Sequence, residues 1–174
     1  MFEHFKDSAR ITLNDKFLGD EKCPQLAEFL AAHKRVEALE VKSNDIGPKG
    51  FKLIFEALTQ NPNLRYLVLE YNDLGALSKG EEGVEELGNL LSVLNKLEYL
   101  NLSNNKLTDR ALEVLSTPIS LSRSLKLVEL KFNEVTSKGL KHLAGDLERN
   151  KNNTLLFVEA TGNKVDKQTH ESLE

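Results

Sequence analysis

The chain has 174 residues, of which 23 are basic and 27 acidic, with a formal net charge of −4 at pH 7. This length suits one domain with a substantial core, and the mixed charges argue against a nucleic-acid-binding protein, which usually carries a basic face. No apolar run approaches the length of a membrane span, the start lacks the form of a secretory signal, and a single cysteine excludes an internal disulfide. We therefore expect a cytoplasmic or nuclear protein that is neither secreted nor bound to a membrane.

The chain repeats one pattern. Two apolar residues separated by one residue are followed by Asn and a further apolar residue, as in Leu39-x-Val41-x-x-Asn44-x-Ile46. Copies begin at residues 11, 39, 67, 100, 128 and 158, so the steps are 28, 28, 33, 28 and 30 residues. The first and last copies are degenerate. We predict a single domain, residues 1–174, with a cap at 1–9, six repeats over 10–165 and a C-terminal tail at 166–174.

Each repeat is predicted to begin with a strand at the two apolar residues and to continue as a helix. In the second repeat, Pro48 suits the first helical turn, and Ile54 and Leu58 recur at helical spacing. Thr108-Asp109 and Thr136-Ser137 are predicted to supply helix caps in the fourth and fifth repeats. The extra five residues fall at 75–83, which we expect to form a loop at one edge of the repeats.

Strand plus helix in about 28 residues resembles the ribonuclease-inhibitor-like subclass of leucine-rich repeat proteins, as does the Asn-x-Ile-Gly-x-x-Gly stretch from Asn44 to Gly50. The resemblance extends from about Ile11 to Val165. It implies an α/β solenoid, a right-handed βα superhelix with a parallel sheet on the concave face and helices on the convex face. Repeat proteins of this kind bind partners and rarely catalyse reactions.

An asparagine recurs at a fixed position after each strand except the first, where Lys16 stands instead. Its amide can bond backbone groups of the neighbouring turn that would otherwise be buried without partners. We expect a stacked structural column. It consists of Asn44, Asn72, Asn105, Asn133 and Asn163.

The residues that alternate with the core positions are expected to face the concave surface. Several of them are aromatic or large and aliphatic, which favours partner binding at an exposed surface; the alternative is that the rings support one another on the sheet. This apolar set comprises Tyr66, Tyr71, Tyr99, Leu127, Phe132 and Phe157. A polar rim suited to orientation and partner choice comprises Glu40, Lys42, Glu70, Glu129, Lys131 and Glu159.

Catalytic, cofactor and metal sites are not predicted. The four histidines lie in different repeats or tails, without metal-type spacing. Cys23 begins a predicted helix, where a thiol pKa can fall, but no basic partner is placed beside it by sequence. The stretch Gly47–Gly50 lacks the pattern of a phosphate loop.

We therefore predict a monomeric, non-enzymatic protein-interaction module with a protein partner that the sequence does not name. Two alternatives stay open from the resemblance. One is a regulator of GTPases like the Ran activator; the other is an actin-linked regulator resembling the repeat domain of tropomodulin. A piece of a longer repeat array is a further alternative, against which we count the degenerate end repeats.

Overall fold

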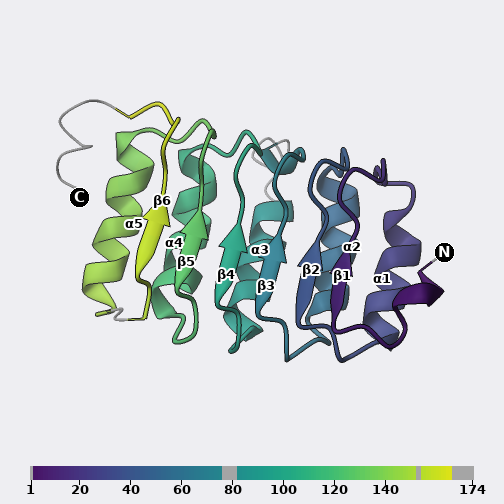
Figure 1. Cartoon of the computed structure of the whole chain (residues 1–174). Helices are drawn as coiled ribbons and strands as arrows, with labels where there is room; N and C mark the ends of the chain where they lie inside the picture. Colours follow the sequence, from purple (N-terminus) through teal and green to yellow (C-terminus); the bar gives the residue numbers. More distant parts are fainter. Residues whose placement is uncertain (1, 76–81, 152–153, 166–174) are drawn as a thin grey trace.

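The computed structural model describes residues 2–75, 82–151 and 154–165. Within them, strands and helices alternate along the chain (Figure 1). The strands are β1 (Arg10–Thr12), β2 (Ala38–Glu40), β3 (Tyr66–Val68), β4 (Tyr99–Asn101), β5 (Leu127–Glu129) and β6 (Phe157–Glu159). The helices are the 3-10 turn η1 (Glu3–Phe5), α1 (Cys23–Ala32), α2 (Pro48–Leu58), α3 (Glu82–Val93), α4 (Asp109–Leu121) and α5 (Ser137–Arg149).

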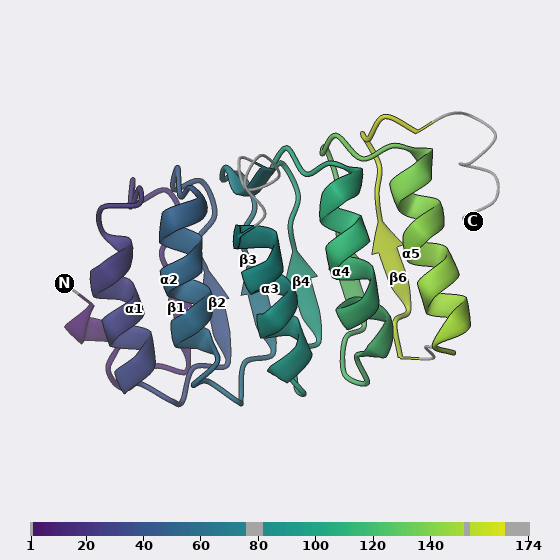
Figure 2. The ribbon, with the colours of Figure 1, turned by 180° about the vertical axis from the view of Figure 1, so that it is seen from behind.

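The six strands form one parallel sheet in sequence order. They pair without slippage, so that Leu39 lies beside Leu67 and Leu67 beside Leu100. The sheet covers one side of the molecule and the helices the other, as Figures 1 and 2 show from opposite directions. Helices pack about 8–10 Å apart and strands about 4.8 Å apart, so the sheet forms the concave face. The predicted leucine-rich repeat solenoid is confirmed.

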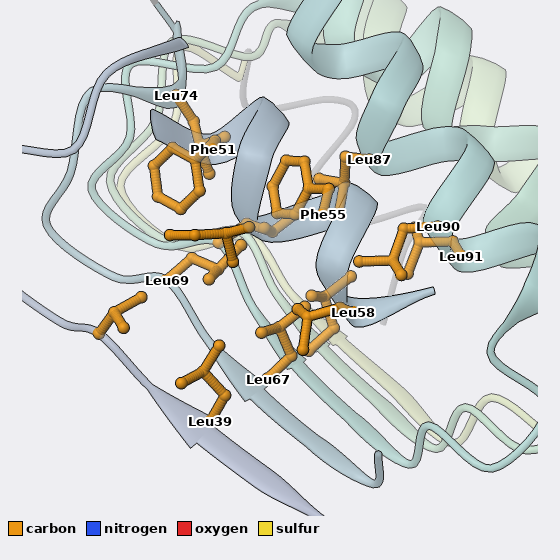
Figure 3. Packing of buried hydrophobic residues seen from close by; sticks show 14 of the residues in the cluster. Leu39, Phe51, Phe55, Leu58, Leu67, Leu69, Leu74, Leu87, Leu90 and Leu91 are labelled. Carbon is orange, nitrogen blue, oxygen red and sulfur yellow. The ribbon is translucent and has the colours of Figure 1, made fainter. Parts of the chain in front are cut away.

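The core lies between the two layers. Leu39, Leu67 and Leu69 enter it from the sheet side, while Phe51 and Phe55 enter it from α2 (Figure 3). All five are at most 1% exposed. Burying one such side chain stabilises the fold by about 1.5–3 kcal/mol. Because each strand has only three residues, this repeated burial is what holds every coil to the next.

The two ends of the stack differ. At the N-terminal end Phe2 is 4% exposed, and its ring lies 6.0 Å from that of Phe29 in α1. At the other end Val158 of β6 is only partly buried, whereas Val128 of β5 is fully buried between two neighbouring strands. The predicted tail at 166–174 and most of the predicted loop at 75–83 lie outside the described residues.

Helix capping differs from the prediction at one of two threonines. Thr136 accepts a hydrogen bond within α5, but the side chain of Thr108 caps nothing. Instead, the Asp109 carboxylate accepts bonds from the N–H (2.7 Å) and the hydroxyl (2.6 Å) of Thr136 in the next repeat. Asp20 likewise accepts from two N–H groups at the start of α2, at 2.8 and 3.0 Å. An acid of one repeat therefore caps the helix of the next, which satisfies donors that no local residue reaches.

Candidate functional site

The asparagine column lies inside the molecule and forms a ladder between coils. The four from Asn44 to Asn133 are at most 8% exposed, and Asn163 at the end is half-buried. Each side-chain oxygen accepts from the backbone of the preceding coil; that of Asn44, for example, accepts from Lys16 (3.0 Å). Each amide nitrogen donates to carbonyls of its own and the preceding coil. These residues hold coils together and offer nothing to a partner.

The first apolar column runs straight across the sheet. Tyr66 pairs with Tyr99, Tyr99 with Leu127, and Leu127 with Phe157. The rings of Tyr66 and Tyr99 lie 6.4 Å apart in a tilted arrangement. Exposure divides the column, because Tyr66 (37%) and Phe157 (56%) face solvent while Tyr99 and Leu127 are half-buried. The contact surface of this column is therefore concentrated at β3 and β6.

Tyr99 is held by its neighbours. Its hydroxyl donates to Glu129 (2.7 Å) and accepts from the amide of Asn101 (3.3 Å). Burial, followed by the adjacent Glu129 carboxylate, raises the pKa of Tyr99 far above its ordinary value. The phenol therefore stays neutral and tied to the sheet, which is the supporting role weighed as the alternative for these rings.

A second apolar group lies where strands pass into the following turns. Tyr71 is 51% exposed and Phe132 57% exposed. Both have a left-handed backbone, with φ of 53° and 52°. The same turn position is left-handed in every repeat, where it is otherwise occupied by Asp15, Ser43, Asn104 and Gly162. A bulky residue in this conformation is uncommon, since the left-handed region costs L-residues about 1–2 kcal/mol each.

Gly162 explains how the Phe132 ring is accommodated. A Cβ at Gly162 would lie 2.4 Å from Cδ1 of Phe132, so the ring occupies the space that a side chain in the next turn would need. The ring of Tyr71 contacts a cation instead, with Nζ of Lys42 lying 5.3 Å from its centroid. Each ring is thus supported on one side and open to solvent on the other.

The predicted polar rim is an array of contacts between side chains on the concave face. The glutamates pair with nearby cations in Arg10–Glu40 (3.6 Å), Lys42–Glu70 (3.1 Å) and Lys131–Glu129 (2.7 Å), and Glu159 accepts from the N–H of Thr161 (3.1 Å). The bond to Glu129 raises the pKa of Lys131. Partly exposed ion pairs contribute only about 0–1 kcal/mol, so a partner can displace them at little cost.

One part of the concave face was not foreseen. In β4, Asn101 is 5% exposed, and Ser103, just after the strand, is fully buried although both alternate with core positions. The Asn101 side-chain oxygen accepts from the backbone N–H of Ser103 (2.9 Å), and the Ser103 hydroxyl accepts from the N–H of Lys131 (3.2 Å), so both short side chains bond to the backbone. The small size of both residues is the sequence feature from which their burial could have been predicted. The fourth repeat, which carries these two residues, lies between the repeats that carry Tyr71 and Phe132.

The described residues contain no group of three or more His, Cys, Asp and Glu side chains able to hold a metal ion. They also contain no helix long and apolar enough to span a bilayer. Burial, with a contribution from Asp20, raises the pKa of the Cys23 thiol to about 12, and its Sγ donates to the Gly19 carbonyl (3.1 Å). That thiol is protonated near neutral pH and is not an activated nucleophile.

Three comparisons relate the chain to known proteins. A family model described as Leucine Rich repeat matches residues 60–77, 93–116 and 121–144. The chain is 31% identical over 99 residues to "Leucine-rich repeat-containing protein 45" of Gallus gallus, and the aligned segment covers 57% of this chain and 14% of that protein. It is 37% identical over 82 residues to "NACHT, LRR and PYD domains-containing protein 14" of Mus musculus, covering 47% and 8%. The chain thus matches only a small part of either relative.

Among solved structures, the fold is similar to the tropomodulin C-terminal domain of Caenorhabditis elegans. The TM-score is 0.63 with 20% identity, and the match covers 86% of this chain and 92% of that chain. At this identity the likeness shows the fold alone.

Proposed function

Because this chain is a leucine-rich repeat protein, we propose that it acts without catalysis as an interaction module that binds a protein partner through the concave face of its sheet. The repeat length of 28 residues supports its assignment to the ribonuclease-inhibitor-like subclass. The contact residues are the apolar set and the polar rim predicted from the sequence, with the partner unnamed.

The observation that carries the proposal is the exposure of Tyr71 and Phe132 in a left-handed turn. The same turn in the fourth repeat uses Asn104, a residue type that adopts this conformation readily. Folding alone therefore does not require aromatic rings here. Backbone strain that persists with an exposed ring is typical of sites kept for binding.

The arrangement also fits the anatomy of protein interfaces. Exposed rings act as anchors in many interfaces, and polar groups around them set orientation. Here the exposed rings of Tyr66 and Phe157 lie on strands, and those of Tyr71 and Phe132 lie on the turns that follow β3 and β5. Tyr99 and Leu127 contribute to the same face mainly as support.

The test is affinity capture from cell lysate with wild type and the double variant Tyr71→Asn/Phe132→Asn. Asn is chosen because the fourth repeat already uses it in this turn. Loss of two anchors should weaken binding of a concave-face partner by about 2–4 kcal/mol, which removes it from the captured fraction.

The matched control is Val93→Ala/Leu121→Ala, which removes two exposed apolar side chains (55% and 52%) from the ends of α3 and α4. It should keep the captured partner. If the Asn variant keeps the partner while the control loses it, binding belongs to the helical face and the proposal is wrong.

An actin-linked regulatory role is the second candidate, favoured by the fold shared with the tropomodulin domain. Co-sedimentation of the purified chain with actin filaments tests it directly. The GTPase-regulating alternative has no comparable support in the described residues, and measuring GTP hydrolysis by Ran with and without the chain tests it.

A further inference from the structure

A cluster of cations occupies the edge of the solenoid opposite to the turns of Tyr71 and Phe132. At this edge the chain leaves each helix and enters the next strand, where the strand arrows of Figure 1 begin. The cluster, here called the basic edge cluster, consists of Arg65, Lys96, Arg123 and Lys126. These residues line a cavity of about 460 Å³. Their concentration is notable in a chain of net charge −4.

One carboxylate lines the same cavity. Glu98 pairs with Lys126 (2.7 Å) and with Arg65. Hydrogen bonds from Lys126 and Arg65 lower its pKa, so it is ionised near neutral pH. Four cations and one anion leave a formal charge of +3 around the cavity. Glu98 therefore positions two cations without neutralising the cluster.

The other two cations bond to neutral oxygens. Nζ of Lys96 donates to the side-chain oxygen of Asn63 (2.7 Å), and the Arg123 guanidinium donates to the carbonyl of Asn150 (3.4 Å). A neutral oxygen compensates less charge than a carboxylate does, so these two groups retain most of their attraction for an anion.

Two further residues characterise what would fit. Ser124 lines the cavity, and its Oγ is buried without a hydrogen-bond partner in the described part of the chain. Such groups are rare and call for a partner, which a polar ligand in the cavity would supply. Leu156 also lines the cavity and is 77% exposed, which offers an apolar contact beside the charges.

We propose that the basic edge cluster binds a phosphorylated side chain on a protein segment, with Leu156 contacting an apolar residue next to it. A phosphate ester carries a charge of about −1.5 to −2 and three acceptor oxygens, which suits two guanidinium groups, two ammonium groups and one hydroxyl better than a single carboxylate does. A nucleic acid would need a track for successive phosphates. The basic edge cluster lines one cavity beside an apolar residue and not a row of such sites, which favours the peptide.

This site is separate from the concave face, and its test does not depend on the proposed function. The ¹H–¹⁵N NMR spectrum of the whole chain is titrated with an eight-residue peptide that holds one phosphoserine beside a leucine. The unphosphorylated peptide and an eight-nucleotide single-stranded DNA are titrated in parallel. The phosphopeptide should shift amides of residues 94–98 and 122–126 in a saturable way and bind about tenfold or more tightly than its unphosphorylated form.

Variants of the basic edge cluster test which residues bind the phosphopeptide. Lys96→Gln/Arg123→Gln should weaken phosphopeptide binding about tenfold or more, and Ser124→Ala by about two- to fivefold. The matched control Lys49→Gln/Lys141→Gln removes the same charge from exposed positions on α2 and α5 and should change affinity less than about twofold. Dispersed amide signals in the same spectra show that each variant is folded.

Three outcomes would overturn the proposal. One is equal binding of the two peptides, which means that phosphate is not recognised. The second is equal weakening by the test and control variants, which indicates unspecific attraction. The third is tighter binding of the DNA than of the phosphopeptide at the same amides, which makes the cluster a nucleic-acid site.

Discussion

Replacing Asn133 with Ala should destabilise the fold through two backbone donors. The Asn133 side-chain oxygen accepts from the N–H groups of Asn105 and Leu107, both at 3.0 Å. All three residues are at most 5% exposed. Alanine removes the acceptor, and neither water nor another side chain in the described structure replaces it, because the site is enclosed.

The magnitude follows from counting the groups left without partners. The Asn133 amide nitrogen also donates to the carbonyls of Leu102 (3.0 Å) and Leu130 (2.8 Å). These carbonyls keep another donor, from Asn105 (3.2 Å) and Asn163 (2.8 Å) respectively. The loss is therefore mainly that of two buried N–H groups at about 1–3 kcal/mol each. We expect a total of about 4 kcal/mol, a large part of the about 5–15 kcal/mol that stabilises a typical domain.

The control is Asn163→Ala at the end of the column. There, among the described residues, the side-chain oxygen accepts only from the N–H of Val135 (3.1 Å), at a half-buried site. We expect a loss of about 1–2 kcal/mol. Urea unfolding at pH 7, followed by circular dichroism and fitted with one shared m-value, measures the loss of stability in both variants. A loss below about 1 kcal/mol for Asn133→Ala, or one no larger than for Asn163→Ala, would refute the reasoning.

Gly162→Ala should cost about 1–2 kcal/mol in the same urea assay, since φ is +79° and the new Cβ meets the Phe132 ring; Phe132→Ala in the same chain should recover the steric part only. Cys23 should not react with Ellman's reagent at pH 8 until urea is added. Because the thiol pKa is about 12 in the fold and near 9 in the unfolded chain, the free energy of unfolding includes a contribution that is full below pH 9 and falls as pH rises toward about 12. A flat stability profile in thermal melts over this range contradicts this. Desolvation acts to raise the pKa of Asp109, but hydrogen bonds from Thr136 and its backbone lower it overall. Asp109→Asn should therefore cost about 1 kcal/mol at pH 7 and progressively less as pH falls below the ordinary Asp pKa, which thermal melts across pH will show.

Strand position was predictable because it depends on a local period. The apolar pair at Leu67 and Leu69 buries both members on one side of an extended chain. A step of 28 residues placed Tyr66 beside Ala38 of the preceding coil. The step of 33 residues between Leu67 and Leu100 did not disturb this register, because the added residues precede α3 and not a strand. Both features follow from the side-chain alternation of a strand.

Which aromatic rings are exposed to solvent and which support the sheet was not predictable from the sequence. Tyr66 and Tyr99 occupy equivalent positions, yet in the part of the chain that the structure describes only the Tyr99 hydroxyl donates to a carboxylate, because Glu129 lies on the next strand. Capping of α5 by Asp109 likewise joins groups of different repeats, which the local sequence around α5 does not predict. Such contacts depend on which rotamers neighbouring coils leave open, and a single repeat does not contain that information.

The sequence by itself determined the solenoid, the sheet order and the side of each strand on which a residue lies. These depend on the spacing of apolar residues, because a unit that repeats a strand and a helix buries its apolar residues by stacking against the neighbouring units. The tertiary structure decided which of those residues remain exposed, that Tyr71 and Phe132 have a left-handed backbone, and that cations from three helix-to-strand loops line one cavity. The reason is that exposure, strain and charge clustering depend on distances between coils, which are set only when the stacked chain packs.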